Sequence, residues 1–391
     1  MGASGAGHRR RCRVCGGHLK RNGRTSGGRT RWRCTECGSS TTRDRADVAR
    51  RAEVTRFVGW LTSTHTQDGA GTGSARSFRR RHAWCWNVEP VIGITGEIYD
   101  EVQLDGTYLA HGWCLLLAVD GTTGTVIALQ WCDTEKTAAW TALLTRIPPP
   151  RVVVTDGGSG LASALKACWP ATKIQRCLVH VQRNVRSYLT SRPRTDAGKT
   201  LRAISLTLTK ITTREQAAAW QARLHAWHQV YGDLITQKTY LTDTRVRPAW
   251  AHANATWWWT HDRLRKAYRL LERLTRTGVL FTYLDPDLTD LNLSSTTNRI
   301  EGGANHPIKD LLRRHRGMTS DHQRRAVEWW CYLHSTKPQP PASLIRPEHW
   351  QPSTPTTDVI NEPIGPTGYD TATSPDEGLW ARSGWAGHSH R

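Results

Sequence analysis

Four cysteines near the start of the chain have the spacing of a zinc site. Two residues separate Cys12 from Cys15, two separate Cys34 from Cys37, and 18 residues lie between the pairs. Thiolate pairs at this spacing close one tetrahedral Zn²⁺ site. Because four thiolates leave no position open for a substrate, we expect a structural zinc that stabilises a ribbon too small to fold on its own core. The alternative interpretation is four unliganded thiols.

Acidic residues on two predicted strands indicate a second metal site. Asp105 lies inside the strand QLDGT, and Asp156 ends the strand VVVTD, at the carboxyl edge where α/β sheets place their sites. If the two strands are neighbours, the carboxylates repel each other unless divalent cations lie between them. Two Mg²⁺ (or Mn²⁺) ions there would activate an in-line attack on phosphorus. Glu301 is the candidate third carboxylate, on a helix capped by Thr296 or Thr297.

Each of these acids also has a purely structural interpretation. Asp156 precedes two glycines and suits a turn, Asp105 suits a strand edge, and Glu301 suits an exposed helix face. Other acids compete with them from a hairpin turn, a polar loop and an amphipathic helix. These are Asp120, Asp285, Asp287, Asp290 and Glu272. Residue pattern alone leaves the choice among them open.

Two other motifs carry weaker chemical information. Cys177 and His180 could supply two metal ligands, but no second pair at matching spacing follows them, so we expect packing or hydrogen bonding near the active site. The run Trp257-Trp258-Trp259 could stack on an unpaired base, although core packing is the preferred interpretation.

Arginines on a predicted helix point to DNA recognition. Two helical stretches, about residues 46–64 and 74–86, flank a polar segment, and we assign residues 44–90 to a helix-turn-helix unit. Trp84 and Trp86 could pack the second helix onto the first. A recognition helix in the major groove has this character, whereas the alternative is a solvated basic face. The arginines concerned are Arg76, Arg79, Arg80 and Arg81.

The charge of the whole chain supports a polyanionic partner. It has 54 Lys and Arg against 33 Asp and Glu, a formal charge of +21 and a pI of about 10.1. No apolar run approaches the ~18 residues of a membrane span, and the first residues lack the apolar stretch of a signal peptide. We therefore expect a cytoplasmic, nucleoid-associated protein with no membrane partner.

The remaining pattern predicts one mixed α/β domain over residues 95–335. Three antiparallel strands are followed by alternating helices and strands, the arrangement of a mixed sheet. A helical insertion covers about residues 181–290, and the Pro-rich, Ser/Thr-rich residues 336–391 have the composition of a disordered tail. The expected strands are 97–110, 113–120, 125–132, 151–156 and 172–177, with helices at 133–147 and 161–169.

Four blocks of sequence, taken together, resemble a known family. They are QLDGTYL with Asp105, VVVTDGGSGL with Asp156, the segment from Ala164 to Val185, and TTNRIEGGAN with Glu301 followed by LLRRHRGM. In this order they resemble the Mutator-like bacterial insertion-sequence transposases of the DDE superfamily, over roughly residues 95–335. Four ordered blocks are more specific than any single acid.

The resemblance implies a ribonuclease H-like fold with a helical insertion between the second Asp and the Glu, which here are 301 − 156 = 145 residues apart. It implies Asp105, Asp156 and Glu301 as the magnesium-binding catalytic triad. Cys177 and His180 are the characteristic pair of the family, and Asn298 has a supporting role. Its partners would be double-stranded DNA at the element ends and target, bound by at least a dimer. One alternative is a non-catalytic DNA-binding regulator derived from a transposase, and another is an RNA-directed nuclease.

One feature departs from the expected pattern. Pro307 falls where the helix that carries Glu301 should continue, and proline inside a helix removes a hydrogen bond and kinks it. Gly302 and Gly303 loosen the same helix. We therefore expect an interruption close to Glu301.

Overall fold

The computed structural model describes residues 11–12, 14–26, 30–42, 46–67, 74–109, 112–244 and 246–350. The chain divides into two units, Met1–Ile345 and Arg346–Arg391. Of the expected tail, residues 351–391 lie outside the described residues. Its first part contains short 3-10 turns at Pro341–Ser343 and Pro347–His349. In the described part of the chain, no helix is long and apolar enough to span a lipid bilayer.

A small antiparallel sheet follows the first cysteine pair. Its three strands are β1 (Leu19–Arg24), β2 (Thr30–Cys34) and β3 (Ser40–Thr41), in spatial order β1-β2-β3. Nearly all side chains of β1 and β2 are exposed or half-buried, apart from Cys34. The segment has almost no hydrophobic core, which agrees with the sequence-based expectation that a metal must hold it.

Two helices follow, as the sequence predicted. α1 (Ala46–Thr62) and α2 (Ala75–His82) are followed by the 3-10 helix η1 (Ala83–Asn87). The rings of Trp86 and Phe57 meet edge to face at 4.7 Å, and the indole N–H of Trp84 donates to Glu53 at 3.0 Å. The two tryptophans therefore join the second helix to the first, as expected, although residues 68–73 between the helices lie outside the described part.

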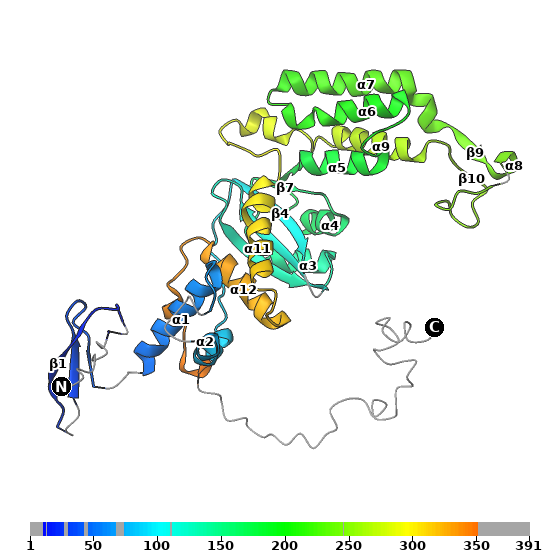
Figure 1. The fold of residues 1–391 in the computed structure, drawn as a ribbon. Coiled ribbons are helices and arrows are strands. Elements are labelled where there is room, and N and C mark those ends of the chain that lie inside the picture. The colour runs from blue at the N-terminus through cyan, green and yellow to red at the C-terminus, as the bar shows by residue number, and fades with distance from the viewer. Residues whose placement is uncertain are drawn as a thin grey trace, which may run out of the picture. The chain divides into compact units, whose positions relative to one another are not determined.

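A five-stranded mixed sheet forms the centre of the fold (Figure 1). Its order is β6-β5-β4-β7-β8, with the first three strands antiparallel and β4, β7 and β8 parallel. This confirms the predicted three antiparallel strands and the predicted mixed sheet. The strands are β4 (Glu101–Tyr108), β5 (Cys114–Asp120), β6 (Val126–Cys132), β7 (Val152–Thr155) and β8 (Lys173–Arg176).

Helices cover both faces of this sheet. α3 (Thr137–Leu144) and α4 (Ser159–Cys168) pack on one face, where Leu104 of β4 and Trp140 of α3 share a buried core. Successive side chains of a strand point to opposite faces, so Asp105 faces away from that core. The opposite face receives α10 (Asn298–Ile300) and α12 (Ser320–Leu333).

The insertion has a hydrophobic core of its own. Its helices are α5 (Leu178–Leu189), α6 (Asp196–Leu206), α7 (Arg214–Thr236) and α9 (Asp262–Arg276), which lie side by side in Figure 1 and enclose buried aliphatic and aromatic residues. The chain therefore contains the expected helical layer between the second Asp and the Glu.

The helical insertion also contains one short pair of strands, which was not predicted from the sequence. β9 (Lys238–Tyr240) and β10 (Trp257–Trp259) form an antiparallel pair. A run of aromatic residues has high strand propensity, and alternation then buries Trp258 at 8% exposure while Trp257 remains 38% exposed. Core packing thus holds for Trp258 and not for Trp257, which instead lies 4.3 Å from the Lys238 ammonium.

The helix that carries Glu301 is not broken by Pro307. α10 leads into a π-helical turn at Glu301–Asn305, and α11 (His306–Arg314) follows without a gap. In an α-helix the N–H of residue 307 would bond the carbonyl of Gly303, and proline has no such N–H. The wider turn takes up this mismatch, as π-bulges commonly do near functional sites. The expected interruption is therefore a local widening that leaves the helix continuous.

Candidate active site and zinc site

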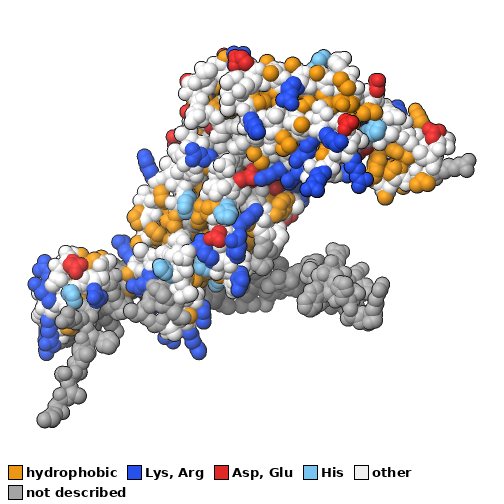
Figure 2. Space-filling view, turned by 45° about the horizontal axis from the view of Figure 1, so that its top comes forward, with side chains coloured by type: hydrophobic (Ala, Val, Ile, Leu, Met, Phe, Trp, Pro, Cys, Tyr) orange, Lys and Arg blue, Asp and Glu red, His pale blue; other side chains and the backbone are white. Residues whose placement is uncertain are grey.

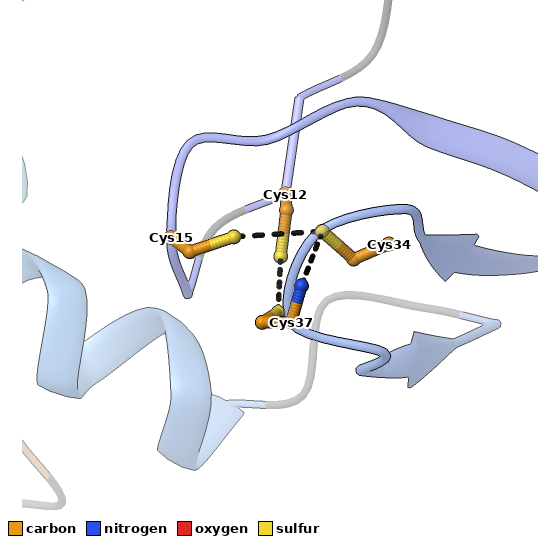
Figure 3. A group of neighbouring side chains, drawn as sticks. All are labelled: Cys12, Cys15, Cys34 and Cys37. Carbon is orange, nitrogen blue, oxygen red and sulfur yellow. Dashed lines mark hydrogen bonds between the residues drawn. The ribbon is translucent and has the colours of Figure 1, made fainter.

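The four N-terminal cysteines converge on one point (Figure 3). The Sγ atoms of Cys12 and Cys37 lie 3.6 Å apart, and those of Cys15 and Cys34 lie 3.4 Å apart. Four sulfurs around a tetrahedral Zn²⁺ at ~2.3 Å would lie ~3.8 Å from one another, close to these separations. The set therefore fits a zinc ion without rearrangement of the backbone.

Local turns position these cysteines. The N–H of Gly16 donates to the carbonyl of Cys12 at 2.9 Å, and Gly16 has φ of 80°, which favours glycine. Backbone N–H groups also point at the sulfurs, from Val14 to Cys12 and from Glu36 to Cys34, both at 3.4 Å. Such donors stabilise thiolates, so both turns are prepared to hold a cation.

The acidity of the thiols agrees with this interpretation. Burial opposes ionisation of Cys12, but hydrogen bonds from Ser39 and nearby backbone groups lower its pKa to about 6. For Cys15, the backbone of Gly17 favours the thiolate, but Cys37 and Cys34 together raise its pKa to about 12. Four adjacent thiols cannot all ionise alone, whereas a bound cation stabilises all four thiolates.

The two aspartates lie at one edge of the central sheet. β4 and β7 are parallel neighbours with Leu104 opposite Thr155, so Asp105 and Asp156 are the next residues in register. Asp105 is 9% exposed, and Asp156 directly follows β7. The Oδ1 atom of Asp156 accepts the N–H of Gly158 at 3.0 Å, which orients its carboxylate. The convergence expected from the sequence is therefore present.

Glu301 reaches the same pocket from the other end of the insertion. Asp105, Asp156 and Glu301 line one open pocket together with His180 and Asn305. Among the residues that the structure describes, the three acids do not form a compact donor cluster, and the donor atoms grouped with that of Glu301 belong to Cys177 and His180. Thr297 occupies the N-cap position, but its hydroxyl makes no backbone cap and lies 3.0 Å from Glu301 Oε1 instead. Thr297 therefore lies at the N-cap position, as expected, but its hydroxyl donates to Glu301 and accepts no backbone N–H of the helix.

Burial and repulsion alter the ionisation of Asp105. Burial, with a further contribution from the negative charge of Asp156, raises its pKa to about 7. The side-chain amide of Asn305 donates to Asp105 Oδ2 at 2.7 Å, which fixes the carboxylate. A carboxyl group in this state binds a proton or a cation readily, which is the behaviour expected of a metal ligand.

Glu301 is held by residues of α5. Arg183 donates to Glu301 Oε2 at 3.0 Å, and His180 Nδ1 lies 3.6 Å from Glu301 Oε1. The Thr297 hydroxyl lies 3.2 Å from the sulfur of Cys177. Burial alone would raise the pKa of Cys177, but interactions with His180 and Thr297 lower it, and the interaction with Cys177 raises the pKa of His180. The Cys177 and His180 pair thus lies beside the pocket and contacts its third acid.

The competing acids lie away from this pocket. Asp120 accepts the N–H of Thr122 at 2.9 Å in the turn after β5, as the sequence indicated. The others form ion pairs on the surface: Asp285 and Asp287 with Lys173, Asp290 with Arg151, and Glu272 with Arg269 and Arg276. Each of these acids therefore has a structural partner outside the pocket.

Several site residues were not found from the sequence. Asn305, Arg183 and Lys309 approach the acids only in three dimensions. Glu135 is a fourth carboxylate, packed against Gly106, and burial and the charge of Asp156 raise its pKa. The helical spacing of Glu301 and Asn305 could have indicated Asn305, but no local signal distinguishes Glu135.

The predicted DNA-binding arginines are on the surface. Arg76, Arg79, Arg80 and Arg81 of α2 are all exposed, and Arg79 donates to Gln67 at 2.8 Å. Figure 2 shows Lys and Arg side chains gathered on the N-terminal ribbon as well. Asn298 is also exposed at the start of α10 and does not line the pocket. Among the ribbon residues that the structure describes, the exposed Lys and Arg side chains are Arg11, Lys20, Arg21, Arg24, Arg31 and Arg33.

Part of the chain matches known proteins. Residues 113–247 match the family described as Transposase, Mutator family, a segment that contains Asp156, Cys177 and His180 but neither Asp105 nor Glu301. The transposase for insertion sequence element IS905 of Lactococcus lactis subsp. lactis (strain IL1403) is 33% identical over 103 residues, which are 23% of this chain and 26% of that protein. The alignment thus spans about a quarter of that relative. These findings support the resemblance seen in the sequence: residues 113–247 are similar to Mutator-family transposases, and part of the chain is similar to an insertion-sequence transposase.

Proposed function

We propose that the protein is a DNA transposase that binds the ends of its insertion sequence and cuts and joins DNA strands with divalent metal ions. The observation that carries the proposal is that Asp105, Asp156 and Glu301 line one pocket, although 145 residues separate the last two. The meander followed by parallel strands supports a ribonuclease H-like fold for this domain.

The chemistry requires a cation that these acids could hold. Mg²⁺ or Mn²⁺ bound by Asp105, Asp156 and Glu301 would activate a water or a 3′-hydroxyl and stabilise the leaving oxygen. Carboxylate oxygens are the donors that these hard cations prefer. The protein contributes the fixed orientation of Asp105, through Asn305, and of Asp156, through the turn at Gly158.

Basic groups around the acids suit a phosphodiester. His180, Arg183, His306 and Lys309 line the same pocket as the carboxylates. A phosphate that enters the pocket would therefore meet positive charge at its rim. The mixture of central acids and peripheral cations favours a nucleic-acid backbone over a small neutral substrate.

The N-terminal modules supply DNA binding in this proposal. The exposed basic residues of the ribbon and of α2 would contact the phosphates and grooves of double-stranded element ends. α1 is connected to the catalytic helices, because Arg314 donates to the carbonyl of Ser63 at 2.7 Å and His315 contacts the carbonyl of Leu61 at 2.8 Å. Two ends and a target would require at least a dimer, acting on the nucleoid in the cytoplasm.

A comparison of binding with cleavage tests the proposal. Asp156→Asn should abolish Mg²⁺-dependent cleavage of DNA that carries the flanking sequence of the gene, while gel-shift affinity for that DNA stays unchanged. Glu272→Gln, at a half-buried position of α9 that does not line the pocket, is the matched control and should retain both activities. Cleavage by Asp156→Asn would refute the assignment of the acids. End binding without cleavage by the wild type would favour a regulator, and cleavage only of RNA would favour a nuclease of the same fold.

A further inference from the structure

The second cluster of metal-binding groups in the described residues lies beside the pocket and combines sulfur, nitrogen and oxygen. One donor atom each from Cys177, His180 and Glu301 falls within 4.8 Å of the other two. The sequence showed only the first two residues, and no second Cys or His pair was available to complete a site. The fold supplies the third ligand from the helix beyond the insertion.

We propose that Cys177, His180 and Glu301 form a binding site for a Zn²⁺-class cation, distinct from the four-cysteine site and sharing Glu301 with the catalytic pocket. Three protein ligands with one open position are typical of zinc sites that admit solvent. His180 and Glu301 line the open pocket, so an ion and a water molecule can reach them. The metal site itself does not depend on the proposed function. Only the statement that Glu301 is shared with a catalytic pocket rests on that function.

The surroundings of the cluster support metal binding. His180 Nδ1 is buried, has no well-aligned hydrogen-bond partner among the described residues, and lies 3.6 Å from Glu301 Oε1. A buried polar atom without such a partner indicates an unfilled interaction. Cys177 is fully buried at the start of α5, and its backbone position is fixed because its N–H donates to the carbonyl of Thr155 at 2.8 Å. Cys177 and His180 are therefore held by the sheet edge and by α5, and Glu301 lies on the π-helical turn that leads into α11.

Two contacts of Glu301 would have to adjust. The Thr297 hydroxyl lies within hydrogen-bond distance of both Cys177 Sγ and Glu301 Oε1, but it has one proton and can donate to only one of them at a time. Arg183 contacts Glu301 through a side chain that is 50% exposed, and exposed ion pairs of this kind hold little free energy. Neither contact blocks a cation.

The two metal sites would then compete. Thiolate and imidazole ligands favour zinc-like ions, whereas a carboxylate-only set favours Mg²⁺. In this structure the donor atom of Glu301 clusters with those of Cys177 and His180 and not with those of Asp105 and Asp156. Excess Zn²⁺ should therefore hold Glu301 away from the two aspartates and inhibit the Mg²⁺-dependent reaction.

Cobalt binding to the full-length protein tests the site without DNA or catalysis. The protein is prepared with one Zn²⁺ per chain in the four-cysteine site, where Zn²⁺ binds more tightly than Co²⁺. Addition of Co²⁺ should produce a sulfur-to-cobalt absorption band that saturates at one Co²⁺ per chain and disappears when Zn²⁺ is added. Cys168→Ser, in a half-buried cysteine of α4 outside the cluster, should behave like the wild type.

Variants of the three ligands complete the test. Cys177→Ser should abolish the band, and His180→Asn and Glu301→Gln should weaken Co²⁺ binding more than about tenfold. The partly exposed His180 provides the decisive variant if Cys177→Ser fails to fold. Absence of the band in the wild type, or its persistence in Cys177→Ser, would overturn the proposal. Cobalt binding by a wild-type protein that never cleaves DNA would preserve this site and refute only the proposed function.

Discussion

Replacement of Asp105 by Asn should make the metal-free fold more stable at neutral and higher pH. In the folded protein its pKa is about 7, above the usual 3.8, because the side chain is buried and close to Asp156. A rise of about 3 units corresponds to about 4 kcal/mol. Between pH 3.8 and about pH 7, Asp105 keeps its proton in the folded state but has lost it in the unfolded state. The free energy of unfolding of the wild type therefore falls as pH rises through this range. Above pH 7 both states are ionised and the loss is complete.

The Asn side chain lacks this titration but retains most of the geometry. Its carbonyl oxygen can still accept the hydrogen bond that Asn305 donates to Asp105 at 2.7 Å. The variant should therefore match the wild type at pH 4 and exceed it by up to about 4 kcal/mol at pH 8. Urea unfolding at both pH values, followed by circular dichroism without added Mg²⁺, measures the difference.

Two further measurements complete this test. Glu272→Gln should change stability by less than about 1 kcal/mol at either pH, since its ion pairs are on the surface. Added Mg²⁺ should stabilise the wild type at pH 8 but have little effect on Asp105→Asn. A stability difference that does not depend on pH, or an Asn variant less stable at pH 8, would refute the argument that Asp105 is strained by burial and repulsion.

Three other predictions address the remaining modules. Cys34→Ser should release zinc and weaken binding to element ends, as measured by metal analysis and gel shift; unchanged end binding would show that the ribbon has another role. Replacing Arg79, Arg80 and Arg81 with Ala should reduce the slope of log DNA affinity against log salt concentration by up to about 3. An unaltered slope would show that this face of α2 is solvated and does not contact DNA. Pro307→Ala supplies the missing N–H and permits an α-helical register, so cleavage should fall while the melting temperature is maintained; unaffected cleavage would show that the π-turn does not position the catalytic glutamate.

The sheet was predictable because its signals are local. Alternating and β-branched stretches marked all five strands, and the condition for Asp105 and Asp156 to converge, that their strands are neighbours, is met in the structure. The zinc cluster was equally accessible, since the spacing of Cys12, Cys15, Cys34 and Cys37 is itself the signal. In both cases the relevant contacts follow from pattern and simple geometry.

The other parts of the site depend on long-range packing. Asn305 meets Asp105 across 200 residues, and Thr297 meets Cys177 across 120, so neither contact has a local signature. The interruption expected close to Glu301 is present, but its π-helical form was not predicted, because propensity arguments address only whether an α-helix continues or kinks. The π-turn is a third possibility, decided by how the flanking residues pack.

Mapping of DNA nicks to single nucleotides tests the central claim most directly. A plasmid that carries the flanking DNA of this gene is incubated with Mg²⁺ and either the wild type or Glu301→Gln. We predict nicks at defined element borders with the wild type and none with the variant. Border nicks by both proteins would contradict the role of Glu301, and specific binding with no nicks by either would contradict the assignment of a catalytic transposase.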